Sequence, residues 1–350
     1  MSGTITITEQ NELFTSTMHV AGKEIIDQND YQLPFWDKQN AVHGKGKPAD
    51  EGGKFFVEPL EFHEHSQTTQ LSNGYELVDL TVQSVTTPMK DDWGFWVRPV
   101  VVSEKEKMQN RGSYKNFDRV KERTRTSIAG MRREMHKRIW GSGGAGLTDL
   151  NTLNGVLFGD GFLEEDAVAS QGNTVHGVSK GTFATSLGWQ NQSGTASNDF
   201  SANGLDVMTQ IAVNAQSLFG AAEREGGAED LCWYLSTSAF QHMKKDTRSF
   251  EQYTAKTAQD AGKLDLMWNG VPVMINRDMA LGNGTTTAMS AALIDHRWIR
   301  LRFQNGYFFK MGEFASPMNQ LISAAPIKCA AQLETRFMGT SGIMINAETY

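Results

Sequence analysis

The most regular hydrophobic pattern in the chain lies between residues 115 and 140. Apolar side chains recur there at spacings of three and four residues, which places them on one face of an α-helix. Ser113 or Asn116 can cap the start of this helix, and the glycine-rich run 141–144 can end it. The apolar stripe consists of Phe117, Val120, Ile128, Met131, Met135 and Ile139. The sequence therefore predicts one long amphipathic helix over residues 115–140.

Between residues 54 and 103 the pattern is typical of β-strands. A tight-turn signal at 72–75 separates an outgoing strand from strand-like positions that continue to 85. We expect a break at 86–88 and a hairpin tip at Asp91 and Asp92, after which 93–103 returns the chain as a strand. The outgoing strand begins with Phe55, Val57, Leu60 and Phe62. The sequence thus predicts a long two-stranded excursion.

Such an excursion favours self-association. Pro99 lacks a backbone donor, so the returning strand is expected at a sheet edge or beside a bulge. Two strands cannot bury both of their faces alone, and in a homo-oligomer the neighbouring subunit supplies the cover. Aromatic and Arg side chains commonly anchor such interfaces. The predicted intersubunit contacts are Phe55, Phe56, Trp93, Phe95, Trp96 and Arg98 in the excursion, and Tyr31 and Trp36 in the N-terminal arm.

The remaining segments predict an α/β lobe followed by further strands. Residues 1–53 show little periodicity, with an aromatic cluster around Pro34, and we expect an extended arm. Helix and strand patterns alternate after residue 204, which is typical of a compact α/β lobe. From Met289 the pattern is again that of strands. The predicted helices are 204–222 and 238–245, and the predicted strands are 231–235, 271–275, 299–303, 307–311 (as a hairpin return) and 327–337.

The helical region is basic although the protein is acidic. Residues 104–140 hold twelve Lys and Arg against five Asp and Glu, a balance of +7, whereas the whole chain carries −7, so the remainder carries −14. A basic helix can bind nucleic acid, or it can face acidic surface on a neighbouring chain. We favour the second interpretation, because aromatic interleaving and a known binding motif are both missing from the sequence.

Composition narrows the class of protein. The 350 residues are 39% hydrophobic and 21% charged, which is ordinary for a globular protein. No stretch approaches the ~20 apolar residues of a membrane span, and the first residues do not form a secretory leader, so an intracellular chain is expected. Cys232 and Cys329 have no metal-ligand spacing, and we expect buried thiols.

A search for reactive motifs finds one weak candidate. On a strand, His63 and His65 would share a face and could bind a metal ion, while Glu64 would point away, so at least a third ligand must come from elsewhere. An exposed polar loop is the alternative. The glycines at 159 and 161 lack the Lys-Ser/Thr ending of a phosphate-binding loop, and there is no nucleophile elbow. We therefore predict no catalytic residue, no metal and no cofactor, hence a protein that is not an enzyme.

The order of these features resembles that of the major capsid proteins of tailed bacteriophages, which have the Hong Kong 97 fold. The segments that carry the resemblance are GGKFFVEPL at 52–60, RPVVVSE at 98–104, NRG at 110–112 and LNTLNGV at 150–156. It extends over nearly the whole chain and implies an α+β fold. The implied parts are an N-terminal arm at 1–53, an extended E-loop at 54–103, a P-domain at 104–154 and 286–335 with its spine helix at 115–140, and an A-domain at 155–285 and 336–350.

The resemblance also implies a function. Copies of the chain would assemble through hexamers and pentamers into an icosahedral-type head that encloses double-stranded DNA without sequence-specific binding. We also expect assembly in the host cytoplasm and a final location in the virion. Scaffolding, portal and decoration proteins are the candidate partners, and no contact with a membrane is expected. Two alternatives stay open: an encapsulin-type nanocompartment shell, and a metal-dependent hydrolase that uses His63, Glu64 and His65.

Overall fold

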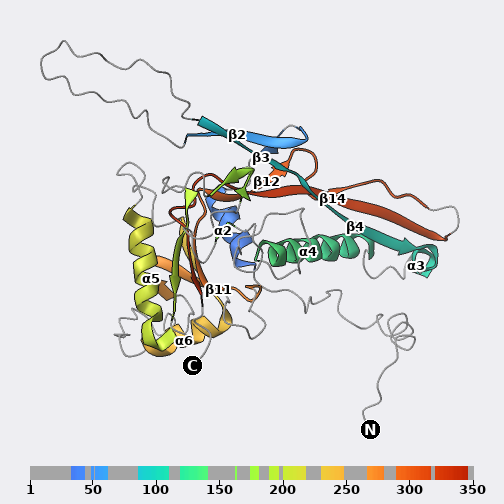
Figure 1. Ribbon diagram of the computed structural model, residues 1–350. Helices are drawn as coiled ribbons and strands as arrows, with labels where there is room; N and C mark the ends of the chain where they lie inside the picture. The colour runs from blue at the N-terminus through green and yellow to red at the C-terminus, as the bar shows by residue number, and fades with distance from the viewer. Residues whose placement is uncertain are drawn as a thin grey trace, which may run out of the picture. The chain divides into compact units, whose positions relative to one another are not determined.

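The structure is a computed structural model (Figure 1). It describes residues 33–43, 49–50, 52–61, 86–109, 119–140, 162–163, 174–180, 189–196, 200–217, 230–247, 266–279, 289–316 and 320–345. Contacts divide the chain into two compact units. The first comprises Met1–Gln32, Trp96–Arg133 and Tyr307–Cys329, and the second comprises Leu33–Phe95, Glu134–Gly306 and Ala330–Tyr350.

A six-stranded sheet forms the centre of the second unit (Figure 1). Its strand order is β7 (Gln192–Thr195), β15 (Gly342–Ile345), β11 (Met289–Asp295), β8 (Leu231–Leu235), β10 (Val271–Ile275) and β9 (Leu266–Trp268). All five residues of β8, Leu-Cys-Trp-Tyr-Leu, are buried. A continuous apolar strand of this kind requires cover on both faces of its sheet.

Helices α5 (Phe200–Ser217) and α6 (Thr237–Thr247) cover one face of this sheet. Ile211 of α5 and Phe240 of α6 share one hydrophobic core with Trp233 of β8. The sheet approaches α5 closely at Gly342, where a β-carbon would overlap the side chain of Ile211. Any larger residue at this position would force the Ile211 side chain to shift.

Helix α2 (Pro34–His43) supplies aromatic cover next to Tyr234 of β8. Phe35 packs edge-on against Trp140 with ring centroids 6.0 Å apart, and Trp140 lies 5.1 Å from Tyr234. Gln39 Nε2 donates to His296 Nδ1 at 2.7 Å, and His296 Nε2 forms a hydrogen bond of 2.7 Å with the Tyr234 hydroxyl. The prediction of an extended arm over residues 1–53 is therefore wrong for residues 34–43, which form this helix. Pro34 is its first residue, a position where a backbone N–H has no partner within the helix, so the missing N–H of proline costs nothing.

A second sheet has five strands, and it contains the late strands of the chain. They are β1 (Ala49–Asp50), β4 (Gly94–Ser103), β12 (Ile299–Gln304), β13 (Lys310–Met311) and β14 (Ile322–Thr335). The predicted alternation in β12 is confirmed, because its odd-numbered residues are buried. The predicted hairpin of 299–303 with 307–311 is wrong: β12 and β13 both pair with β14. At 14 residues, β14 is long enough to pair with each of them at a different place.

In the first unit, the predicted long helix is confirmed as α4 (Arg119–Ile139), which continues into the second unit. Residues 110–118 lie outside the described part, and the short helix α3 (Glu104–Gln109) precedes them. Strand β4 lies along α4, since Arg123 donates to the Val101 carbonyl at 2.5 Å. None of the helices in the described ranges is both long and apolar enough to cross a membrane.

Most of the other predicted elements are also confirmed. Strands β8 and β10 have the predicted bounds, α6 extends its prediction at both ends, and β14 begins five residues before the predicted strand. Helix α5 begins four residues early at Phe200, and its predicted end lies outside the described residues. Cys232 and Cys329 are free, buried thiols, as predicted. The domain boundaries stay predictions.

Candidate functional site: the base of the β2–β3 ribbon

Strands β2 (Phe55–Glu61) and β3 (Thr86–Asp92) form a separate two-stranded sheet in the second unit, here called the β2–β3 ribbon. Seven antiparallel pairs run from Phe55 opposite Asp92 to Glu61 opposite Thr86. The predicted excursion is therefore confirmed at its base, but its partner strand is 86–92 and not 93–103. The expected break at 86–88 and the expected tip at Asp91 and Asp92 are wrong, because all of these residues belong to β3.

Two prolines explain why this strand escaped prediction. Pro59 and Pro88 face each other in the ribbon. Neither has an N–H, so their pair must occupy a non-hydrogen-bonded position, where the backbone groups point away from the partner strand. By alternation, Lys90 and Asp92 also direct their backbone groups to the outer edge of β3. The Lys90 N–H donates to the His176 carbonyl at 3.0 Å, and the Asp92 carbonyl accepts from Gln332 Nε2 at 2.9 Å.

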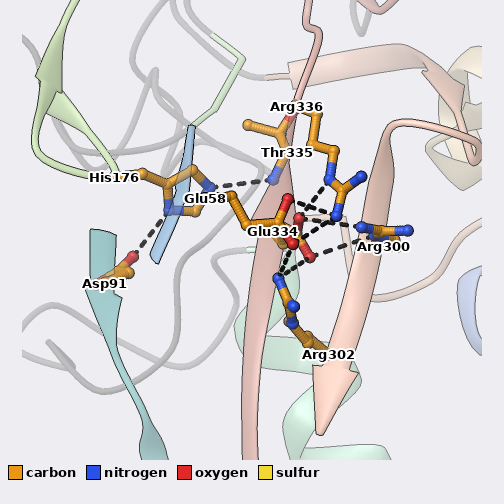
Figure 2. Close-up of polar contacts among 8 residues, drawn as sticks. All are labelled: Glu58, Asp91, His176, Arg300, Arg302, Glu334, Thr335 and Arg336. Atoms are coloured by element: carbon orange, nitrogen blue, oxygen red, sulfur yellow. Dashed lines mark hydrogen bonds and ion pairs between the residues drawn. The ribbon is translucent and has the colours of Figure 1, made fainter. Parts of the chain in front are cut away.

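His176 is the polar centre of this edge (Figure 2). It lies between β5 (Thr174–Val175) and β6 (Val178–Ser179), and its side chain is fully buried. Its Nε2 lies 3.0 Å from the Thr335 backbone nitrogen, and its Nδ1 lies 3.0 Å from Asp91 Oδ2. A backbone N–H can only donate, so Nε2 accepts and the proton resides on Nδ1, which donates to Asp91. A neutral imidazole thus connects β3 with the end of β14.

Aromatic rings enclose the imidazole. The ring centroids of Phe56 and Phe162 lie 5.5 Å and 5.1 Å from that of His176, both in edge-on geometry. Phe56 also packs edge-on against Trp93 at 5.8 Å. This apolar enclosure excludes water, which strengthens the two imidazole hydrogen bonds and makes the loss of either one costly.

A cluster of five charged residues lies beside His176 (Figure 2). It consists of Glu58 from β2, Arg300 and Arg302 from β12, Glu334 from β14, and Arg336. Arg300 contacts Glu334 directly across the strand pair through two hydrogen bonds of 3.2 Å each. Arg336 Nε donates to Glu334 at 2.8 Å, and Arg302 Nη1 donates to it at 3.2 Å. Alternation in β12 places its arginines on the face opposite to its buried apolar residues.

The two carboxylates of the cluster have different tasks. Burial of Glu334, whose side chain is 0% exposed, raises the pKa of that carboxyl, but hydrogen bonds from Arg300 and Arg336 and the charges of Arg300 and Arg302 outweigh it, so the pKa lies below its ordinary value. Glu334 is therefore an anion at the centre. Glu58 accepts from Arg302 at 2.5 Å and pairs with Arg336. It attaches β2 to the cluster.

The arrangement is suited to holding the ribbon. Glu58 and Phe56 on β2, and Asp91 and Met89 on β3, direct their side chains into the second unit. The opposite face carries Val57, which is 58% exposed. The ribbon is thus fixed on one face and exposes apolar side chains on the other.

The structure places the predicted contact residues in two groups. Phe55 and Phe95 are exposed, at 40% and 62%, and Arg98 is exposed as well. Phe56, Trp93 and Trp36 are buried within the chain, and Trp96 is half-buried. Tyr31 lies outside the described residues. The intersubunit role of all of them stays a prediction, and the exposed members are the ones whose surface is still available to a neighbour.

The predicted helix stripe becomes more buried toward its end. Met131, Met135 and Ile139 are buried, whereas Val120 and Ile128 are half-buried. Phe117 lies outside the described residues. In the first unit, α4 meets β4 at Gly130, where a β-carbon would lie 2.6 Å from Arg98 Nη1.

The predicted metal candidate cannot be located. His63, Glu64 and His65 all lie outside the described residues. Within the described ranges, no group of three or more His, Cys, Asp and Glu side chains is placed to hold a metal ion. Sequence reasoning missed His176 and the charged cluster. The available signals were the His-Gly pair between two short β segments, and arginines that alternate with the apolar residues of 299–303.

Comparisons with known proteins agree on the fold. No protein-family model and no curated protein matches this sequence. The structure is similar to the capsid of an empty GTA particle, with a TM-score of 0.60 and 11% identity over 93% of this chain and 94% of that one. It is also similar to the capsid of cyanophage A-1(L), with a TM-score of 0.59 and 12% identity over 96% and 99% of the two chains.

A third match is to a shell of another kind. The SrpI encapsulin from Synechococcus elongatus PCC 7942 matches with a TM-score of 0.51 and 13% identity over 95% of both chains. Identities this low establish the architecture. Over nearly its full length, the chain has the α+β architecture shared by these phage-type capsids and the encapsulin, which is the Hong Kong 97 fold.

Proposed function

We propose that this protein is the major capsid protein of a tailed bacteriophage, and that its copies assemble through hexamers and pentamers into the head shell around double-stranded DNA. Its role is structural and not enzymatic. The fold supports a shell, and matches to phage-type capsids, including cyanophage P-SCSP1u and phage XM1 with TM-scores of 0.52 and 0.50, favour a phage head.

The observation that carries the proposal is apolar strand surface that is exposed in the described part of the subunit. Val57 of the ribbon is 58% exposed, and Phe95 and Val97 of β4 are 62% and 63% exposed. Phe95 and Val97 are alternate residues of one strand, so they lie on the same face. Contiguous exposed apolar surface marks protein–protein interaction sites. We propose that a second copy of the chain covers them.

The charges of α4 support the proposal that DNA is enclosed without tight binding. Arg123 pairs with Glu106 at 2.6 Å, Arg125 with Glu122 at 3.1 Å and Arg138 with Glu134 at 3.3 Å. These arginines are partly neutralised within the chain, which lowers the number of phosphates that the helix can neutralise. The proposed location is the virion after assembly in the host cytoplasm, with scaffolding, portal and decoration proteins as partners and without a membrane.

An encapsulin-type nanocompartment is the second candidate, favoured by the similarity to the SrpI encapsulin. The contents of particles separate the two. Particles isolated from the native source, treated with nuclease and then opened, should release double-stranded DNA if the shell is a phage head. Release of a folded enzyme without DNA would favour the nanocompartment. A purified chain that stays monomeric at high concentration would contradict both.

A further inference from the structure

The turn between β5 and β6 places a histidine in a left-handed backbone conformation. His176 and Gly177 have φ values of 53° and 73°, so both central residues of this two-residue hairpin are left-handed, as in a type I′ turn. The first position of such a turn strongly prefers Asn, Asp or Gly, which tolerate positive φ or support it with a short side chain. Histidine tolerates this conformation better than most residues do, but so do Asn and Gly, and the turn alone does not require an imidazole. The reason for an imidazole must then lie in contacts outside the turn.

The contacts of His176 supply that reason. Its carbonyl accepts from the Lys90 N–H at 3.0 Å, its Nδ1 donates to Asp91 at 3.0 Å, and its Nε2 accepts from the Thr335 N–H at 3.0 Å. The two ring nitrogens point in different directions and reach partners in β3 and β14 at once. An Asn side chain is shorter and carries its donor and acceptor on a single carbon, so it cannot connect the same two partners.

The hydrogen bonds of His176 lie near one end of the ribbon, so they influence the direction of the whole ribbon. A two-stranded ribbon is not rigid by itself, so the fixed points at its base determine its direction. From Asp91 to the end of the ribbon at Thr86 there are five residues, which at about 3.3 Å each extend roughly 16 Å. A tilt of ~10° at the base would therefore move the far end by about 3 Å, which is enough to remove van der Waals contacts there.

We infer that His176 is a positioning residue: it fixes the direction in which the β2–β3 ribbon leaves the second unit, and thereby the place where the ribbon meets a neighbouring subunit. Glu58 acts with it as the second fixed point, on the other strand of the ribbon, through Arg302 and Arg336. This inference rests on the proposed function for its consequence in assembly, but the fixed point itself is a property of the isolated subunit.

Two matched substitutions test the inference. His176→Asn removes the imidazole and keeps a residue that a type I′ turn favours. Gly177→Asn is the control, because Asn tolerates a positive φ, and a β-carbon at this position would meet the nearest atom, the Lys90 carbonyl oxygen, at 3.7 Å, an ordinary contact. We expect His176→Asn to accelerate hydrogen exchange of the Thr335 amide on the order of tenfold, and to yield shells of altered or mixed diameter. Gly177→Asn should change neither.

The outcomes separate this inference from the proposed function. Wild-type particles together with normal His176→Asn particles and unchanged Thr335 exchange would overturn the inference alone. Failure of the wild type to form any particle would overturn the proposed function, while exchange at Thr335 would still test the fixed point. If His176→Asn does not fold, nitrogen NMR of the wild type labelled at histidine decides: a protonated Nδ1 and an unprotonated Nε2 support the inference, and the reverse tautomer overturns it.

Discussion

Replacement of Glu334 by Gln tests the charged cluster at the base of the ribbon. The Glu334 side chain is 0% exposed and accepts hydrogen bonds from Arg300, Arg302 and Arg336. Gln has nearly the same size, but it replaces one acceptor with a donor and removes the negative charge. The carboxylate of Glu58 would still pair with Arg302 and Arg336, but Arg300, which donates two hydrogen bonds to Glu334, would face the new amide.

The cost can be worked out from these contacts. Loss of one partner from a buried ion pair costs about 3–5 kcal/mol. Because Gln retains one acceptor and Glu58 still neutralises two of the arginines, we expect the lower end, about 3 kcal/mol. For a chain of 350 residues, with an unfolding entropy of about 2.1 cal/mol/K per residue, this loss should lower the midpoint temperature by roughly 4 °C. Urea unfolding of the unassembled subunit, followed by circular dichroism, measures the change in the free energy of unfolding.

A matched control lies on the surface. Glu134 pairs with Arg138 at 3.3 Å, but its side chain is 44% exposed, so Glu134→Gln should change the free energy of unfolding by less than about 0.5 kcal/mol. The pH dependence gives a second readout. Since the pKa of Glu334 is lowered from its unfolded value of 4.5, its stabilisation is present above that pH and is lost as pH falls through the folded pKa. Glu334→Gln should remove this part of the acid dependence. A Glu334→Gln subunit as stable as the Glu134→Gln control would refute the reasoning.

The remaining predictions concern the core of the second unit. Gly342→Ala introduces a β-carbon that overlaps Ile211, so we expect a loss of about 1–3 kcal/mol in the free energy of unfolding. Gly270→Ala is the comparison variant. Its β-carbon would meet nothing within 4 Å, but its φ is +79°, so this variant measures the cost of backbone strain alone. Burial raises the pKa of Cys232 to about 12, so a thiol reagent at pH 8 should label it only after unfolding. Rapid labelling of Cys232 in the native subunit would contradict its burial.

The sequence predicted elements whose pattern is local. Helix α4 follows from apolar residues at spacings of three and four, and β8 and β10 follow from short apolar runs between turn signals. Helix α2 was not predicted, because its residues are held by partners that are distant in the sequence. Phe35 packs on Tyr234, and Gln39 donates to the Ile299 carbonyl. Such contacts leave no periodic trace in the sequence.

The site was beyond prediction for a related reason. Glu58 reaches Arg302 and Arg336 across 244 and 278 residues of sequence, and no spacing rule connects them. Strand β3 was misjudged because Pro88 looks like a break, whereas opposite Pro59 it fits a non-hydrogen-bonded position. Only His176 left a local signal, a bulky ring beside Gly177 in a tight turn.

A reconstruction of the purified protein by electron cryomicroscopy tests the central claim most directly. We predict closed shells in which the exposed faces at Val57, Phe95 and Val97 lie against a neighbouring copy of the chain. A single subunit in solution, or a shell in which these three side chains remain exposed to solvent, would contradict the account.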